Sequence, residues 1–119
     1  MKELLLSAYL LGISFLLNAA KTDTIVVHSP SMKKNIKACV VIPENYNNTE
    51  KSFPVLYLLH GYGGNYATFI KNFPVISEAA DQYGMLLVCA DGGLSGWYMD
   101  SPVDSLMRYE TYITKELVV

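Results

Sequence analysis

The sequence predicts an α/β fold with a parallel sheet, and three observations lead to this class. Two short β-branched segments, 23–29 and 36–43, flank a polar turn, which is typical of a hairpin. Two further segments, 54–60 and 85–90, are apolar throughout, as expected of parallel strands that are covered on both faces. A helical pattern at 74–84 separates these two segments. Strand, helix and strand in this order after a hairpin favour the α/β class.

Two helices are predicted, at 74–84 and from about Asp104 onward. Pro74 suits the first helical position of the first helix, and Gly84 suits its C-terminal stop. In the second helix, apolar residues recur on one face. These residues are Leu106, Tyr109, Ile113 and Leu117. We therefore expect the order β-α-β-α after the initial hairpin.

The predicted sheet is short of strands. Two parallel strands and a hairpin leave an edge that is apolar on both faces, and such an edge is open to aggregation. The last helix also runs into Val118 and Val119 without a glycine or a cap. We therefore expect residues 21–119 to be the N-terminal portion of a longer, here incomplete, α/β domain.

Length and charge limit the classes of function. The 119 residues suffice for one modest domain, and a hydrophobic content of 51% indicates a globular protein with a core. The net charge of −2 comes from scattered residues of both signs. Because no basic stripe is present to meet phosphates, we expect no nucleic acid partner.

Residues 1–20 have the layout of a secretory signal peptide. A lysine near the start precedes an apolar stretch from Leu4 to Leu17, and small residues follow at Ala19 and Ala20. The apolar stretch is shorter than the roughly 20 residues of a spanning helix. The sequence thus predicts a secreted or periplasmic protein with no stable membrane span after cleavage. An uncleaved anchor is the alternative.

Two cysteines, Cys39 and Cys89, lie in the middle of predicted strands. Export would permit a disulfide between them, but two buried thiols that act as small hydrophobic side chains are the favoured interpretation. Their spacing fits no metal motif. We predict neither a metal nor a cofactor.

The loop that follows the apolar segment 54–60 is rich in glycine and begins with a histidine. It reads His60, Gly61, Tyr62, Gly63 and Gly64. In open α/β sheets the working site lies beyond the carboxyl ends of the strands, which is where this loop falls. Glycine permits positive φ and close approach of a ligand to the main chain. A backbone N–H exposed there can stabilise the oxyanion of acyl transfer, by about 3–4 kcal/mol for one donor.

Two other interpretations of this loop exist. Its glycines could merely relieve a tight turn, although the position after a buried strand and before a helix favours an oxyanion loop. A phosphate cradle is disfavoured because no Gly-Lys-Ser/Thr ending follows. His60 itself is expected to bond the loop backbone instead of acting as a general base.

These residues resemble a known family. The segments "VVIPENY", "SFPVLYLLHGYGGNYATF", "YGMLLVCADGGLSGWYMDSP" and "RYETYITKEL" are similar to the esterase D type of α/β-hydrolase over about 36–119. That family includes acetyl and feruloyl esterases, S-formylglutathione hydrolases and, more distantly, mycolyltransferases. The resemblance implies that the backbone N–H of Tyr62 is an oxyanion donor and that Trp97 and Tyr98 border the acyl or substrate pocket. It also implies that the last helix immediately precedes the nucleophile strand.

No catalytic triad can be assembled from the 119 residues. The fold requires a G-x-S-x-G elbow, then an acid and a histidine. The nearest match, Ser95, has the bulky Trp97 where the elbow needs glycine. His28 is expected to be an ordinary strand residue. Asp91 and Asp100 could bind a substrate hydroxyl, or equally serve turns or caps. We predict that the nucleophile serine, the acid and the catalytic histidine are not in this chain.

Three functions are consistent with these residues. The first is an exported serine esterase acting on a small-molecule or carbohydrate-linked ester such as an acetyl or feruloyl ester, seen without its nucleophile. The second is an acyltransferase of the same fold. The third is a non-catalytic, glycan-binding remnant, in which Trp97 and Tyr98 stack on a ring. The two aromatic residues could equally plug the loop onto the sheet. The oligomeric state stays open.

Overall fold

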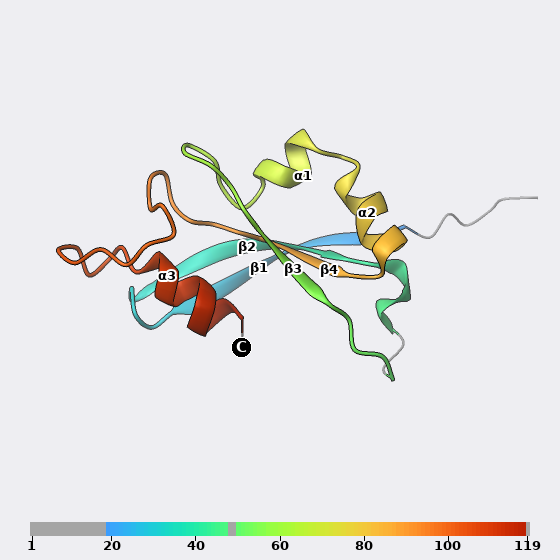
Figure 1. Ribbon diagram of the computed structural model, residues 1–119, viewed down its shortest axis with the longest axis horizontal. Coiled ribbons are helices and arrows are strands. Elements are labelled where there is room, and N and C mark those ends of the chain that lie inside the picture. Colours follow the sequence, from blue (N-terminus) through green and yellow to red (C-terminus); the bar gives the residue numbers. More distant parts are fainter. Residues whose placement is uncertain (1–18, 48–49, 119) are drawn as a thin grey trace, which may run out of the picture.

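The computed structural model describes residues 19–47 and 50–118, and Figure 1 shows their arrangement. The strands are β1 (Lys21–Ser29), β2 (Lys34–Ile42), β3 (Val55–Leu59) and β4 (Leu86–Ala90). The helices are α1 (Thr68–Asn72), α2 (Ile76–Tyr83) and α3 (Tyr109–Thr111), with a 3₁₀ turn η1 (Glu44–Asn47) and a π-helical segment η2 (Tyr112–Leu117) that continues α3. The predicted signal peptide lies outside the described residues except for its last two. In the described ranges, no helix is long and apolar enough to cross a membrane.

The four strands form one mixed sheet in the order β1-β2-β4-β3. β2 pairs antiparallel with both β1 and β4, and β3 pairs parallel with β4. The predicted hairpin followed by a parallel pair is therefore confirmed. Because β3 and β4 run in the same direction, the loops that follow them leave the sheet at the same rim.

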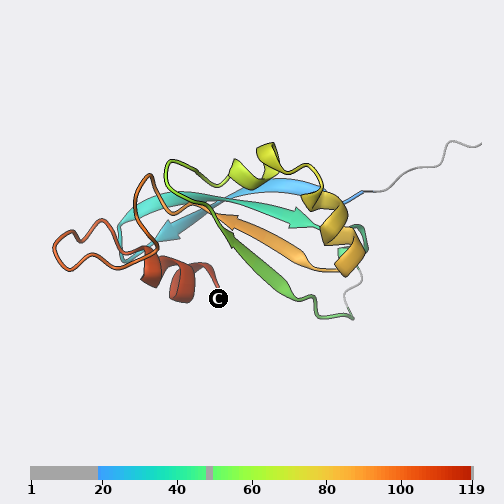
Figure 2. The same cartoon turned by 45° about the horizontal axis from the view of Figure 1, so that its top comes forward.

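Helices cover the two faces of the sheet. α1 and α2 lie on one face and α3 with η2 on the other, as both views show (Figures 1 and 2). A hydrophobic core lies on each face of the sheet, and β2 contributes to both because its side chains alternate between the faces. Cys39 and Val41 pack under α2, whereas Ile36 packs against α3 and η2. The core under α2 contains Cys39, Val41, Ile76, Ala80, Leu87 and Cys89.

Helix α2 follows the sequence pattern closely. Ile76 and Ala80, one turn apart, are buried against the sheet. Gly84 ends the helix with φ of 59°, a left-handed conformation in which glycine carries no side-chain penalty. The predicted stop at Gly84 is confirmed, and the helix begins at Ile76, two residues after Pro74.

The last helix begins later than the sequence predicts. It was expected from about Asp104 but starts at Tyr109. Asp104 instead accepts the backbone N–H of Leu106 at 2.8 Å within a loop. That loop is closed by a bridge between Asp100 and Arg108. Leu106 is consequently 56% exposed and does not share the buried face.

Strand β3 lies at one edge of the sheet. Its outer edge pairs with no strand among the described residues, and Val55, Leu56 and Leu59 are each more than 40% exposed. On the face of the sheet that carries α1 and α2, an apolar groove of about 490 Å³ lies between β3 and these two helices. The predicted apolar edge is therefore present in the structure.

Candidate active-site cleft

Two loops meet at the rim where the parallel strands end. The loop after β3 and the loop after β4 enclose a cleft of about 310 Å³. Its lining includes His60, Tyr62, Gly92, Ser95, Trp97 and Tyr98. The glycine loop and the aromatic pair predicted from the sequence are thus brought to one cleft.

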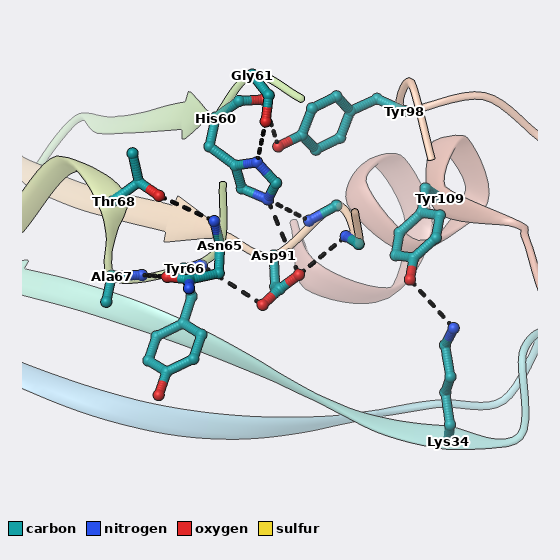
Figure 3. A network of polar contacts seen from close by, with 12 residues as sticks. Lys34, His60, Gly61, Asn65, Tyr66, Ala67, Thr68, Asp91, Tyr98 and Tyr109 are labelled. Carbon is teal, nitrogen blue, oxygen red and sulfur yellow. Dashed lines mark hydrogen bonds and ion pairs between the residues drawn. The ribbon is translucent and has the colours of Figure 1, made fainter. Parts of the chain in front are cut away.

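His60 joins the two loops through both of its ring nitrogens (Figure 3). Nδ1 donates to the carbonyl oxygen of Gly61 at 2.8 Å, and Nε2 accepts the backbone N–H of Gly92 at 3.0 Å. These bonds require a neutral ring with its proton on Nδ1. The ring is only 5% exposed. Since Nδ1 bonds one loop and Nε2 the other, His60 links the two loops of the cleft.

Asp91 supports the same junction from the end of β4. Its Oδ1 accepts the N–H of Gly93 at 2.9 Å, and its Oδ2 accepts the N–H of Tyr66 at 3.4 Å. The distance from Oδ1 to His60 Nε2 is 3.8 Å, which is too long for a hydrogen bond. Asp91 therefore shapes the turn after β4 and holds the segment before α1.

Two glycines of the loop after β3 have specific reasons to be glycine. Gly63 has φ of +75°, and its N–H donates to the carbonyl of Leu94 at 3.0 Å, which ties the two loops together. A Cβ on Gly64 would lie 2.8 Å from His60 Nδ1 and 2.9 Å from Thr68 Oγ1. The loop can therefore pass close to His60 only because Gly64 lacks a side chain.

Tyr62 sits at the turn of this loop with its side chain 75% exposed. The flanking N–H group of Gly63 is engaged with Leu94, and that of Gly64 with the carbonyl of Gly61. Among the hydrogen bonds of the described residues, none uses the backbone N–H of Tyr62. This N–H therefore has no hydrogen-bond partner among the described residues, and Tyr62 lines the cleft.

Trp97 and Tyr98 differ in their surroundings although they are adjacent. Both have positive φ, 52° and 50°, which is unusual for bulky residues and stores strain. The Tyr98 ring packs edge-on against His60 at 5.8 Å, and its O–H donates to the His60 carbonyl at 3.2 Å. Burial raises the pKa of Tyr98 to about 12, so the hydroxyl keeps its proton at neutral pH. Trp97, in contrast, is 73% exposed at the cleft.

The remaining polar candidates do not form a triad. Ser95 is exposed in the cleft, and among the non-glycine residues of this loop positive φ occurs at Trp97 and Tyr98 and not at the serine. His28 lies on β1, where Nδ1 is 2.9 Å from Asn35 Oδ1. Asp100 accepts the N–H and the hydroxyl of Thr111, the last residue of α3, and these two bonds hold its pKa below the ordinary value.

The sequence did not predict the hydrogen-bonded turn over residues 65–68, which directly follows the glycine loop. Asn65 Oδ1 accepts the N–H of Ala67 at 2.8 Å, and Thr68 Oγ1 accepts the N–H of Asn65 at 2.9 Å. This turn leads into α1, which was not predicted. An asparagine three residues before a threonine was the available signal, because both types cap helices and turns. No group of three metal-ligating side chains occurs in the part of the chain that the structure describes.

Comparison with known proteins agrees with this geometry. The model of an esterase family, described as "Putative esterase", matches residues 29–119. Two esterases from strains of Mycobacterium tuberculosis are each 32% identical over 82 residues, which is 66% of this chain and 18% of the relative. The chain thus spans about a fifth of the length of these relatives.

Solved structures show the same fold. An S-formylglutathione hydrolase from Agrobacterium tumefaciens superposes with a TM-score of 0.71 at 18% identity, over 84% of this chain and 42% of that one. A ferulic acid esterase gives 0.70 at 24% identity, over 85% and 41%. A fluorophosphonate-binding serine hydrolase from Staphylococcus aureus gives 0.65 at 20% identity, over 79% and 37%. The sheet is therefore part of an α/β-hydrolase domain. Since the family model spans most of the sequence, the chain belongs to this esterase family.

Proposed function

We propose that this chain supplies the oxyanion side of the active site of an exported serine hydrolase that cleaves carboxylic esters. The observation that carries the proposal is the unengaged backbone N–H of Tyr62, a residue that lines a cleft at the carboxyl ends of parallel strands. The loop that presents it is fixed from both sides by His60 and Gly63. A donor fixed in advance needs no reorganisation when charge develops on the substrate.

The proposed chemistry is acyl transfer through serine. A serine oxygen attacks the ester carbonyl while a histidine takes its proton, and the carbonyl oxygen becomes an oxyanion. The Tyr62 N–H donates to that oxyanion. The tetrahedral intermediate then expels the alcohol, and water hydrolyses the acyl-enzyme to release the acid.

The nucleophile, the acid and the catalytic histidine are proposed to lie outside the 119 residues. Two features support this. His60 cannot activate Ser95, because its Nε2 already accepts the Gly92 N–H and its Nδ1 proton is donated to Gly61. The outer edge of β3 is apolar and has no partner strand among the described residues, so a further parallel strand that carries the elbow can pair there.

The substrate class follows from the cleft and from the proposed export. Trp97 presents an exposed aromatic face that can stack on a sugar or a phenolic ring. The similarity to a ferulic acid esterase is consistent with such a ring. We therefore propose carbohydrate-linked acetyl or feruloyl esters. The same exposed Trp97 also suits two further candidates, an acyltransferase to a sugar hydroxyl and a non-catalytic glycan-binding remnant.

The first test uses the 119-residue chain with a fluorophosphonate probe. We expect no serine to be labelled, because no serine among the described residues is hydrogen-bonded to a histidine. Stoichiometric labelling of any serine in this chain would show that the nucleophile is present and would contradict the proposal.

The second test uses the protein translated from the whole reading frame of the gene, assayed with acetyl and feruloyl esters. Tyr62→Pro removes the N–H, and we expect kcat to fall by roughly 10²–10³-fold. Tyr62→Ala is the matched control, because it removes the side chain and keeps the N–H. Equal activity of the two variants would overturn the oxyanion role. If the unaltered protein binds glycans but cleaves no ester, the non-catalytic glycan-binding remnant is favoured. If it transfers the acyl group to added sugar in preference to water, the acyltransferase is favoured.

A further inference from the structure

Cys39 and Cys89 are directly opposite each other on neighbouring strands. They are register partners in the antiparallel pairing of β2 with β4. Residues opposite each other in an antiparallel pair have Cα atoms about 4.5–5.5 Å apart, which falls within the range of about 4.4–6.8 Å seen in disulfides. The register of the two strands therefore places the two residues at a Cα separation that a disulfide can span.

Both side chains also point to the same face of the sheet. They belong to one core cluster, beneath Ile76 and Ala80 of α2. Cys39 is 4% exposed and Cys89 is 1% exposed, and both are free thiols in the structure. Cys39 is near enough to oppose ionisation of Cys89, whose pKa burial raises to about 11. Cys39 and Cys89 are the two cysteines of the chain, so no other intramolecular pairing competes.

We infer that Cys39 and Cys89 are a disulfide site, which a small-molecule disulfide such as oxidised glutathione converts to a bridge between β2 and β4. The thiolate of one cysteine attacks the glutathione disulfide, forms a mixed disulfide and releases one glutathione thiolate. The second cysteine then attacks the mixed disulfide at the protein sulfur and releases the second glutathione. Two cysteine thiols are oxidised, one glutathione disulfide is reduced to two thiols, and the protein loses two hydrogen atoms.

The burial of both thiols in the folded chain determines when the bridge can form. In the folded chain both thiols are covered by α2, and burial raises both pKa values, so little thiolate is exposed to the oxidant. The bridge therefore forms during folding, before α2 closes over the sheet. It then joins the two ends of the segment that contains β3, the glycine loop, α1 and α2. This segment holds His60 and Tyr62, so the bridge fastens the element that presents the cleft.

The test is to refold the fully reduced 119-residue chain in a buffer of reduced and oxidised glutathione, and then to unfold it at once in denaturant with iodoacetamide, so that every free thiol is blocked. We expect a chain free of intermolecular disulfides that takes up no label, has a mass lower by two hydrogen atoms, and yields a linked peptide containing Cys39 and Cys89. Reduction should then lower the Tm by on the order of 10 °C. The Cys39→Ser/Cys89→Ser variant is the control, and its Tm should not respond to the reductant.

A refolded chain with both thiols labelled would overturn the inference, as would mixed disulfides with glutathione on a refolded chain. If the chain aggregates on refolding, the same labelling is applied to soluble protein expressed in an oxidising bacterial periplasm. There, a linked peptide supports the bridge and two alkylated cysteines exclude it.

Discussion

At the scale of single residues, His60 shows how one side chain can hold two loops of a cleft together. Its two ring nitrogens hold one backbone group from each of the two cleft loops, at 2.8 and 3.0 Å. The Tyr98 hydroxyl holds the His60 carbonyl from a third direction. The Tyr62 N–H is consequently presented by a loop whose neighbouring polar groups are already satisfied.

The packing around His60 makes a sharp prediction for the glycines of the loop. In Gly64→Ala the new Cβ would lie 2.8 Å from His60 Nδ1, so the ring or the loop must shift. We expect a loss of about 1–3 kcal/mol in the free energy of unfolding, measured by urea denaturation. Gly61→Ala is the matched control, since nothing lies within 4 Å of its Cβ. It should stay within about 0.5 kcal/mol of the unaltered chain. Equal losses for both variants would show that His60 is not packed as described.

At the scale of secondary structure elements, the sequence predicted the elements with long or regular patterns. The hairpin, the parallel strand pair and α2 follow from alternation, apolar runs and a glycine stop. Helix α1 has five residues and was missed, because so short a helix has too few positions to show a period. The start of α3 was placed too early, because Leu106 fits the helical spacing while Asp104 and Asp100 form loop bonds instead.

Some features of the cleft could be predicted from the sequence, and others could not. The place of the glycine loop at the cleft and the hydrogen bond of His60 to the loop backbone could be predicted from the position of the loop after a buried strand. The different surroundings of Trp97 and Tyr98 could not, because they depend on two consecutive positive φ angles in residues that rarely adopt them. Asp91 and Asp100 could be assigned to turns and caps only once their partners Gly93 and Thr111 were known.

The attachment of η2 to the hairpin makes a prediction about pH. The Glu116 carboxylate accepts the Ser29 hydroxyl at 2.6 Å and the Ser31 N–H at 2.9 Å. Burial alone would raise the pKa of Glu116, but the hydrogen bonds from Ser29 and Ser31 outweigh it and lower the pKa below its usual value. A lowered carboxyl pKa adds stability above the unfolded-state value, and this stability is lost as the pH falls through the folded-state value.

We therefore expect the unaltered chain to lose stability more steeply than Glu116→Gln as the pH falls below roughly 5. The measurement is the urea midpoint at a series of pH values between about 6 and 3. Glu110→Gln, at an exposed position on α3, is the control and should follow the unaltered chain. If the Glu116→Gln and unaltered curves run parallel over this range, the carboxylate does not anchor η2.

At the scale of the whole molecule, the unpaired edge of β3 and the groove beside it expose apolar surface to solvent. The groove of about 490 Å³ is lined by apolar side chains from β3, α1 and α2. In the α/β-hydrolase structures with which the chain superposes, it covers at most about half of the other chain. The exposed apolar surface of the edge and groove therefore governs how the 119-residue chain behaves on its own.

This surface predicts self-association through β3. Leu56 is 47% exposed and lines the groove, so Leu56→Lys places a charge on the edge that an incoming strand or a second chain would have to bury. We expect the unaltered 119-residue chain to show concentration-dependent association in sedimentation velocity. Leu56→Lys should raise the dissociation constant of this association tenfold or more, because a loss of about 1.4 kcal/mol in the free energy of association corresponds to a factor of ten. Val26→Lys is the control, because Val26 is 60% exposed on β1 at the opposite edge. If Val26→Lys dissociates the chain as well as Leu56→Lys does, association runs through the hairpin edge, and the β3 edge is not the surface that seeks a partner.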